Sequence, residues 1–280
     1  MIVDLMKRPP WSDEAVRRLG DALRDGVEPP TDGPSYDDVL RWYFDLAAEV
    51  QMQIEEGSWS IQPELVTSKA VRMDTDLRIG SRSKTRDTLV QKLRRRPTLT
   101  LDSVQDLAGV RVDADVYLGE QTQLAREIAE HFGNDETVIV DRRDGAKAGY
   151  RGIHVDLQLP AGRVEVQVRT ILQSLWANVY EKLADEVGRG IRYGEAAVPP
   201  PGYDQAEVDN AVQRMQEMSE MIAAREAEWQ EYYADTGDFM RGVKLGTCAM
   251  QKAMMVASFV VGAQTANREA EAARETEEDG

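Results

Sequence analysis

The chain has 280 residues, of which 42% are hydrophobic and 30% charged, so we expect one or two soluble domains with a buried core. Its formal net charge of −16 argues against a dedicated nucleic-acid-binding or membrane-surface protein, because such proteins usually carry a net basic charge. A local basic patch is still compatible with this balance.

Its thiol and imidazole content excludes two further kinds of site. One cysteine, Cys248, cannot form an intramolecular disulfide, and with two histidines it cannot complete a Cys/His zinc site. The N-terminus has no long apolar stretch, and the fairly apolar segment 244–263 is interrupted by Lys252. We therefore expect a cytoplasmic protein without a signal peptide or a membrane span.

Residues 1–60 predict two helices that pack on a core. Ser12 precedes two acids and is expected to be the N-cap of a helix that ends near Gly26. After a Pro/Gly-rich linker, Ser35 begins a second helix that runs to about Gly57 with one apolar face.

Residues 61–197 predict an α+β core, a mixed sheet flanked by helices, because strands and helices do not alternate regularly there. Pro160-Ala161-Gly162 separates two strand-like runs and is typical of a hairpin. The expected elements are a helix from Thr85 or Asp87 to Leu93, a helical turn at 102–107, strands at 108–112, 137–140, 151–159 and 163–170, and helices at 119–132 and 171–187.

Residues 198–280 predict a C-terminal helical extension with an acidic tail. The run Val198-Pro199-Pro200-Pro201-Gly202 is expected to interrupt regular secondary structure. Helical patterns follow at about 208–233 and 239–273. Their methionine-rich face indicates helix–helix packing. We expect a homo-oligomer or an antitoxin-like partner to bind through these helices.

The strand predicted at 163–170 alternates strictly between apolar and polar residues. Glu165, Gln167 and Arg169 share one face, and a half-buried strand with a solvated face is the common explanation. Asp106 lies just before another predicted strand. Magnesium usually takes one or two protein carboxylates and phosphate oxygens, so Asp106 and Glu165 could hold Mg²⁺.

Two other segments have a structural and a functional interpretation. Seven basic residues and one acid lie between positions 82 and 96, which indicates either a solvated helix face or a grip on polyphosphate. The run Gly149-Tyr150-Arg151-Gly152 is either a turn into a hairpin or a place where Tyr150 stacks on a base beside Arg151.

Five motifs in order carry a family resemblance. They are RSKTRDTLVQKL (82–93), DLAGVRV (106–112), GYRGIH (149–154), VEVQVRT (164–170) and LWANVYEKL (175–183). Together they resemble the synthetase domain of the RelA/SpoT family, the alarmone synthetases, over roughly residues 68–193. The resemblance implies a small synthetase with a nucleotidyltransferase-like core and extra helices at both ends.

This resemblance implies the transfer of the β,γ-pyrophosphoryl group of ATP to the 3′-hydroxyl of GDP or GTP, with Mg²⁺ as cofactor. It implies that Asp106 and Glu165 bind the metal and that Glu165 activates the hydroxyl. The implied ATP-binding residues are Arg82, Lys84, Lys92 and Arg111. The implied acceptor-binding residues are Tyr150, which stacks on guanine, with Lys147, Arg151, His154, Gln167 and Arg169.

Three departures from the family pattern keep alternatives open. Glu181 stands where the family usually has histidine, the acceptor loop at 142–148 lacks the Pro-Lys-x-Asn form, and an apparent insertion before Arg82 makes Lys69 and Arg72 rivals for the ATP contact. One alternative is a toxin-type enzyme that pyrophosphorylates the 3′ end of tRNA, which the basic run 92–96 favours. The other is a catalytically degenerate domain that binds nucleotide or a partner.

Overall fold

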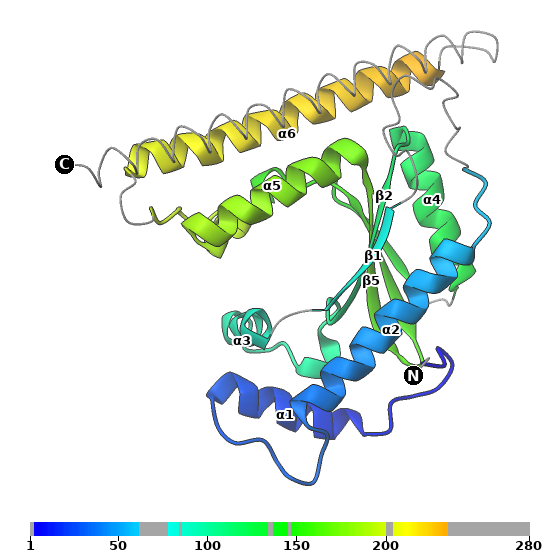
Figure 1. The fold of residues 1–280 in the computed structure, drawn as a ribbon, viewed down its shortest axis with the longest axis vertical. Helices are drawn as coiled ribbons and strands as arrows, with labels where there is room; N and C mark the ends of the chain where they lie inside the picture. Colours follow the sequence, from blue (N-terminus) through cyan, green and yellow to red (C-terminus); the bar gives the residue numbers. More distant parts are fainter. Residues whose placement is uncertain are drawn as a thin grey trace, which may run out of the picture. The chain divides into compact units, whose positions relative to one another are not determined.

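The computed structural model describes residues 3–61, 78–83, 86–133, 137–144, 147–199 and 204–234. Contacts within the chain divide them into two units, with the division in the chain between Ile171 and Leu172. The first unit holds a sheet with its helices, and the second holds the helices that follow it (Figure 1). The expected division at 1–60, 61–197 and 198–280 stays a prediction.

The two N-terminal helices begin and end where their capping residues predict. Helix α1 spans Asp13–Asp25, with the Ser12 side chain accepting from the Ala15 amide, and Gly26 closes it at φ 71° in the left-handed region. Helix α2 spans Tyr36–Glu56 and starts with a capping box between Ser35 and Asp38. Both predicted helices are confirmed.

Five strands form one mixed sheet in the order β1-β2-β5-β4-β3. Strand β2 is antiparallel to β1 and parallel to β5, whereas β4 is antiparallel to both β5 and β3. The predicted α+β class is confirmed. The strands are β1 (Arg78–Ser83), β2 (Ala108–Ala114), β3 (Val138–Asp141), β4 (Ile153–Leu159) and β5 (Gly162–Thr170).

One face of the sheet is apolar and is covered by helices. Helix α2 and helix α4 (Leu118–His131) lie on the same side of the strands (Figure 1). Their buried residues join the alternate valines of β2 and β5 in one cluster, for which Leu46, Val50, Leu124, Ile128, Val110 and Val166 are representative. Since side chains alternate along each strand, the polar residues lie on the other face.

Helix α1 packs closely against the short 3-10 helix η1 (Leu101–Ser103) at Gly20, and a substitution there tests this packing. A Cβ on Gly20 would lie 2.6 Å from the Leu101 Cβ, which is too close for two carbons. We expect Gly20→Ala to destabilise the protein by about 1–2 kcal/mol, because the strain exceeds the ~1 kcal/mol that alanine gains over glycine in a helix.

Urea denaturation of the Gly20→Ala variant measures this loss. Gly80→Ala on β1 is the matched control, because a Cβ there would meet nothing within 4 Å. Equal or increased stability of Gly20→Ala would contradict the packing.

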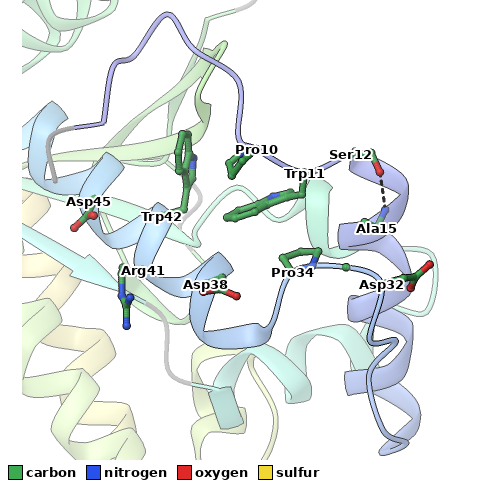
Figure 2. Close-up of a pocket in the computed structure, with 11 residues that line it drawn as sticks. Pro10, Trp11, Ser12, Ala15, Asp32, Pro34, Asp38, Arg41, Trp42 and Asp45 are labelled. Carbon is green, nitrogen blue, oxygen red and sulfur yellow. Dashed lines mark hydrogen bonds between the residues drawn. The ribbon is translucent and has the colours of Figure 1, made fainter.

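A cavity of about 630 Å³ lies between the N-terminal ends of α1 and α2 (Figure 2). Trp11 and Trp42 meet in it edge to face, with ring centroids 5.8 Å apart. The Trp42 indole donates to the Ala161 carbonyl oxygen at 2.8 Å, in the turn that joins β4 and β5. This hydrogen bond fixes α2 to the turn from which β5 starts.

The second unit contains helices α5 (Ile171–Val187) and α6 (Gln205–Ala234), with the short helix η3 (Arg189–Tyr193) between them. Trp176 donates to the Met215 carbonyl oxygen at 2.6 Å, and buried Gln173 donates to Glu226 at 2.9 Å. The helices predicted at 171–187 and 208–233 are confirmed. The helix predicted at 239–273 and the acidic tail lie outside the described residues, and the predicted partner surface stays a prediction.

Candidate active site

The polar face of the sheet brings the predicted motifs into one row. Glu165 of β5 has Gly109 of β2 as its neighbour on one side and Asp156 of β4 on the other. Gly109 in turn pairs with Arg82 of β1. Because Gly109 has no side chain, β2 places no side chain next to Glu165 in this row.

Five polar side chains on and beside this face form a closed circuit of hydrogen bonds. Glu165 is bonded through one carboxylate oxygen to His154 Nδ1 at 3.0 Å and through the other to Gln167 Nε2 at 2.7 Å. The Tyr150 hydroxyl lies 2.8 Å from His154 Nε2 and accepts from Arg169 Nε at 3.2 Å. Arg169 also donates to the Gln167 side-chain oxygen, which closes the circuit.

One arrangement of protons is consistent with every hydrogen bond of this circuit. An ionised Glu165 only accepts, so His154 Nδ1 carries the proton and donates to it. His154 Nε2 then accepts from the Tyr150 hydroxyl, whose oxygen accepts from Arg169. The sequence predicted all five residues as site residues, and the structure brings them together.

The circuit controls the ionisation of Glu165. Burial alone would raise the pKa of Glu165, but the hydrogen bond and electrostatic attraction of His154 and the hydrogen bond from Gln167 outweigh burial, so the net pKa is lowered. The charge of Asp106 acts in the opposite direction. Glu165 is therefore a carboxylate at neutral pH and can accept a hydrogen bond or a proton.

This pKa shift has a testable consequence for pH dependence. The folded-state pKa of Glu165 lies below the ordinary 4.5, so Glu165 stabilises the fold above pH 4.5 and this contribution is lost as pH falls through the lowered pKa. We expect a carboxyl NMR titration midpoint below 4.5 in the wild type. In His154→Ala burial should dominate and raise the midpoint, and an unchanged midpoint would contradict the role of His154.

Asp106 lies beside a positively charged side chain of the same protein. Lys92 Nζ, on helix α3 (Arg86–Arg95), is 2.7 Å from Asp106 Oδ1, and both side chains are about one quarter exposed, at 24% and 28%. Asp106 is also close enough to Glu165 to affect its pKa. The structure therefore places the two predicted metal ligands in one region, where Lys92 would compete with a metal ion for Asp106.

Three further residues predicted for the site, Arg111, Tyr150 and Arg151, differ in where their side chains lie. Arg111 is the register partner of Gln167, on the same face. The guanidinium of Arg169 lies 4.9 Å from the Tyr150 ring centroid, so stacking of that ring on a base would use its other face. Arg151 is buried and donates to the Arg143 carbonyl oxygen in the loop before β4, outside the circuit.

Several predictions fall wholly or partly outside the described residues. Lys69, Arg72 and Lys84 are not described, and the side chains of Arg82 and Lys147 are not described either. In the second unit, Glu181 lies 3.8 Å from the guanidinium of Arg192. The positive charge of Arg192 offsets the negative charge that Glu181 carries at a position where the family usually has histidine.

Sequence reasoning missed one residue of the polar face, Asp156. It is buried, and it lies directly opposite Glu165 in the β4–β5 pairing. The signal was present, because His154 and Asp156 alternate with Ile153, Val155 and Leu157 just as the residues of β5 do.

Comparisons with known protein families and structures identify the class of protein to which this fold belongs. Residues 81–184 match the region found in RelA / SpoT proteins. The fold resembles the crystal structure of the small alarmone synthetase 1 from Bacillus subtilis bound to its product pppGpp, at 19% identity and a TM-score of 0.50, over 72% of this chain and 98% of that one. The chain thus has the fold of the small alarmone synthetases.

The chain contains a region of the RelA/SpoT family, residues 81–184. It is 54% identical over 273 residues to the uncharacterized protein Rv1366 of Mycobacterium tuberculosis, covering 97% of this chain and 95% of that protein. It is 28% identical over 110 residues to the GTP pyrophosphokinase YjbM of Bacillus subtilis, covering 34% of this chain and 50% of that protein. No helix within the described ranges is long and apolar enough to cross a membrane.

Proposed function

We propose that the protein transfers the β,γ-pyrophosphoryl group of ATP to the 3′-hydroxyl of GDP or GTP. The observation that carries this proposal is the ionised Glu165, whose side chain is only 14% exposed and is held by His154 and Gln167 within electrostatic range of Asp106. A fixed carboxylate of this kind can accept the proton of an attacking hydroxyl. The similar YjbM is a GTP pyrophosphokinase, and the similar solved structure has pppGpp bound as product, which supports the same chemistry here.

Asp106 and Glu165 fit a magnesium ion in their donor chemistry. Both offer hard carboxylate oxygens, and Mg²⁺ usually takes only one or two of these and completes its shell with water and phosphate oxygens. When bound, the ion would neutralise charge on the transferred phosphates.

The residues around the carboxylates would act by positioning and charge. Lys92, displaced from Asp106 by a metal, would be free to contact a phosphate of ATP, and Arg111 would lie beside the same region. The circuit through His154 and Tyr150 would hold Glu165 in one rotamer, so that its oxygen stays aligned with the hydroxyl during transfer.

The decisive experiment is a side-by-side acceptor screen. The purified protein is incubated with ATP and Mg²⁺ together with GDP, GTP, GMP, adenosine nucleotides or tRNA. We expect a 3′-pyrophosphorylated product with GDP or GTP. Absence of such a product, in conditions where an active synthetase makes it, would reject the proposal, and nucleotide binding without any transfer would indicate a degenerate relative.

The tRNA 3′ end is a second candidate acceptor, because of the basic run at the end of α3. Arg94, Arg95 and Arg96 are all exposed, and Arg94 Nε donates to the Arg24 carbonyl oxygen at 2.9 Å. We expect that transfer of label from ATP to tRNA, if this candidate is correct, falls in an Arg95→Glu/Arg96→Glu variant. Transfer to GDP by the same variant is the control.

A further inference from the structure

Asp156 is a buried acid with an unsatisfied oxygen. Its side chain is on the same face of the sheet as Glu165, its cross-strand partner, and the residue is 8% exposed. Its Oδ1 is shielded from solvent and has no hydrogen-bond partner among the residues that the structure describes. Buried polar atoms in native proteins nearly always have a partner, so this one requires an explanation.

The surroundings of Asp156 do not offset the free-energy cost of burying its carboxylate. Burial raises the pKa of Asp156, and the negative charge of Glu165 raises it further, against smaller effects of His154, Arg142 and Arg163. An acid in this position is unfavourable for the folded chain by itself. A ligand that supplies a donor at Oδ1 would remove this penalty when it binds.

We propose that Asp156 and Glu165 form a paired-carboxylate subsite for the vicinal 2′,3′-diol of a ribose, in which Asp156 accepts a hydrogen bond from the 2′-hydroxyl. The inference rests on the proposed function, which places the 3′-hydroxyl at Glu165. Directly opposed residues of an antiparallel pair have Cβ atoms about 4.5–5.5 Å apart. Two carboxylates at this spacing can each accept from one of two adjacent hydroxyls.

The hydrogen bonds of Glu165 favour a diol over a bridging metal ion at this pair. Each oxygen of Glu165 already accepts one hydrogen bond, from His154 or from Gln167, and keeps one lone pair for a further partner. Chelation requires the two carboxylates to converge on one point, whereas two hydroxyls can serve them separately. A ribose diol occurs both in free ribonucleotides and at the 3′ end of tRNA, so the subsite suits either acceptor.

Comparison of ribose and 2′-deoxyribose acceptors tests the subsite. For the wild type we expect kcat/KM with GDP, or with whichever acceptor the screen identifies, to exceed that of its 2′-deoxy analogue by about tenfold or more. In Asp156→Val the ratio should fall close to one, because neither sugar gains a bond there. Asp102→Asn is the matched control, since Asp102 pairs with Arg17 and should leave the ratio unchanged.

Calorimetric affinities of GDP and 2′-deoxy-GDP separate this inference from the proposed function. If no acceptor is pyrophosphorylated the proposed function fails, yet a preference for GDP that Asp156→Val abolishes would still support the subsite. Equal wild-type affinities, no binding of either nucleotide, or a preference that survives in Asp156→Val would overturn it. Loss of Mn²⁺ binding in Asp156→Val with an unchanged ratio would instead assign Asp156 to a cation.

Discussion

Replacing Glu165 by glutamine is expected to lower pyrophosphoryl transfer by about 10²–10⁴-fold, the usual contribution of a general base. Glutamine keeps the size of the side chain and an oxygen that accepts from His154, but it cannot take a proton. The expected loss is therefore in kcat, and the melting temperature should fall modestly, because the new amide group cannot accept from both His154 and Gln167. Steady-state kinetics with ATP and the acceptor identified in the screen measure the effect.

Glu127→Gln is the control for the Glu165 substitution. Glu127 lies on α4 and accepts from the Ser60 amide at 2.9 Å, so it is a hydrogen-bonded carboxylate that the proposed chemistry does not use. Its replacement should leave transfer unchanged. Full activity of Glu165→Gln would show that another group, or none, removes the proton.

Replacing Asp106 by asparagine is expected to lower transfer by about a hundredfold or more at a fixed Mg²⁺ concentration, because a bound metal contributes several kcal/mol of charge stabilisation. Part of the loss should be recovered at higher Mg²⁺. The change in stability should be small, since the Asp106–Lys92 pair is partly exposed, at 28% and 24%.

A Mg²⁺ titration of activity measures the effect of Asp106→Asn. Asp102→Asn, a few residues earlier on η1, serves as the control, because its partner is Arg17 rather than Lys92. An Asp106→Asn variant with the wild-type Mg²⁺ dependence would remove Asp106 from the metal site.

Local signals in the sequence predicted the elements well. Ser12 and Ser35 marked helix starts because a serine side chain can accept from the free amides of the first turn. The alternation of Val164, Glu165 and Val166 gave both the strand and its buried face, because side chains alternate across a sheet. The residues of the hydrogen-bonded circuit were predicted from the family motifs rather than from such local patterns.

Long-range pairing could not be predicted in the same way. No local signal indicates that β2 is parallel to β5, because register between distant strands depends on how the whole sheet packs. The same is true of the Lys92–Asp106 ion pair and of Asp156, whose lack of a partner depends on what surrounds it in three dimensions.

The position of β5 has a consequence for synthesis of the chain on the ribosome. Among the described residues it is the last strand along the chain but the central strand of the sheet, where it pairs with β2 on one side and β4 on the other. Before residues 162–170 emerge, the antiparallel pairs β1–β2 and β3–β4 lack the strand that joins them in one sheet. The polar face is thus completed late, and a nascent chain that stops short of β5 lacks Glu165 and the strand that would complete the proposed site.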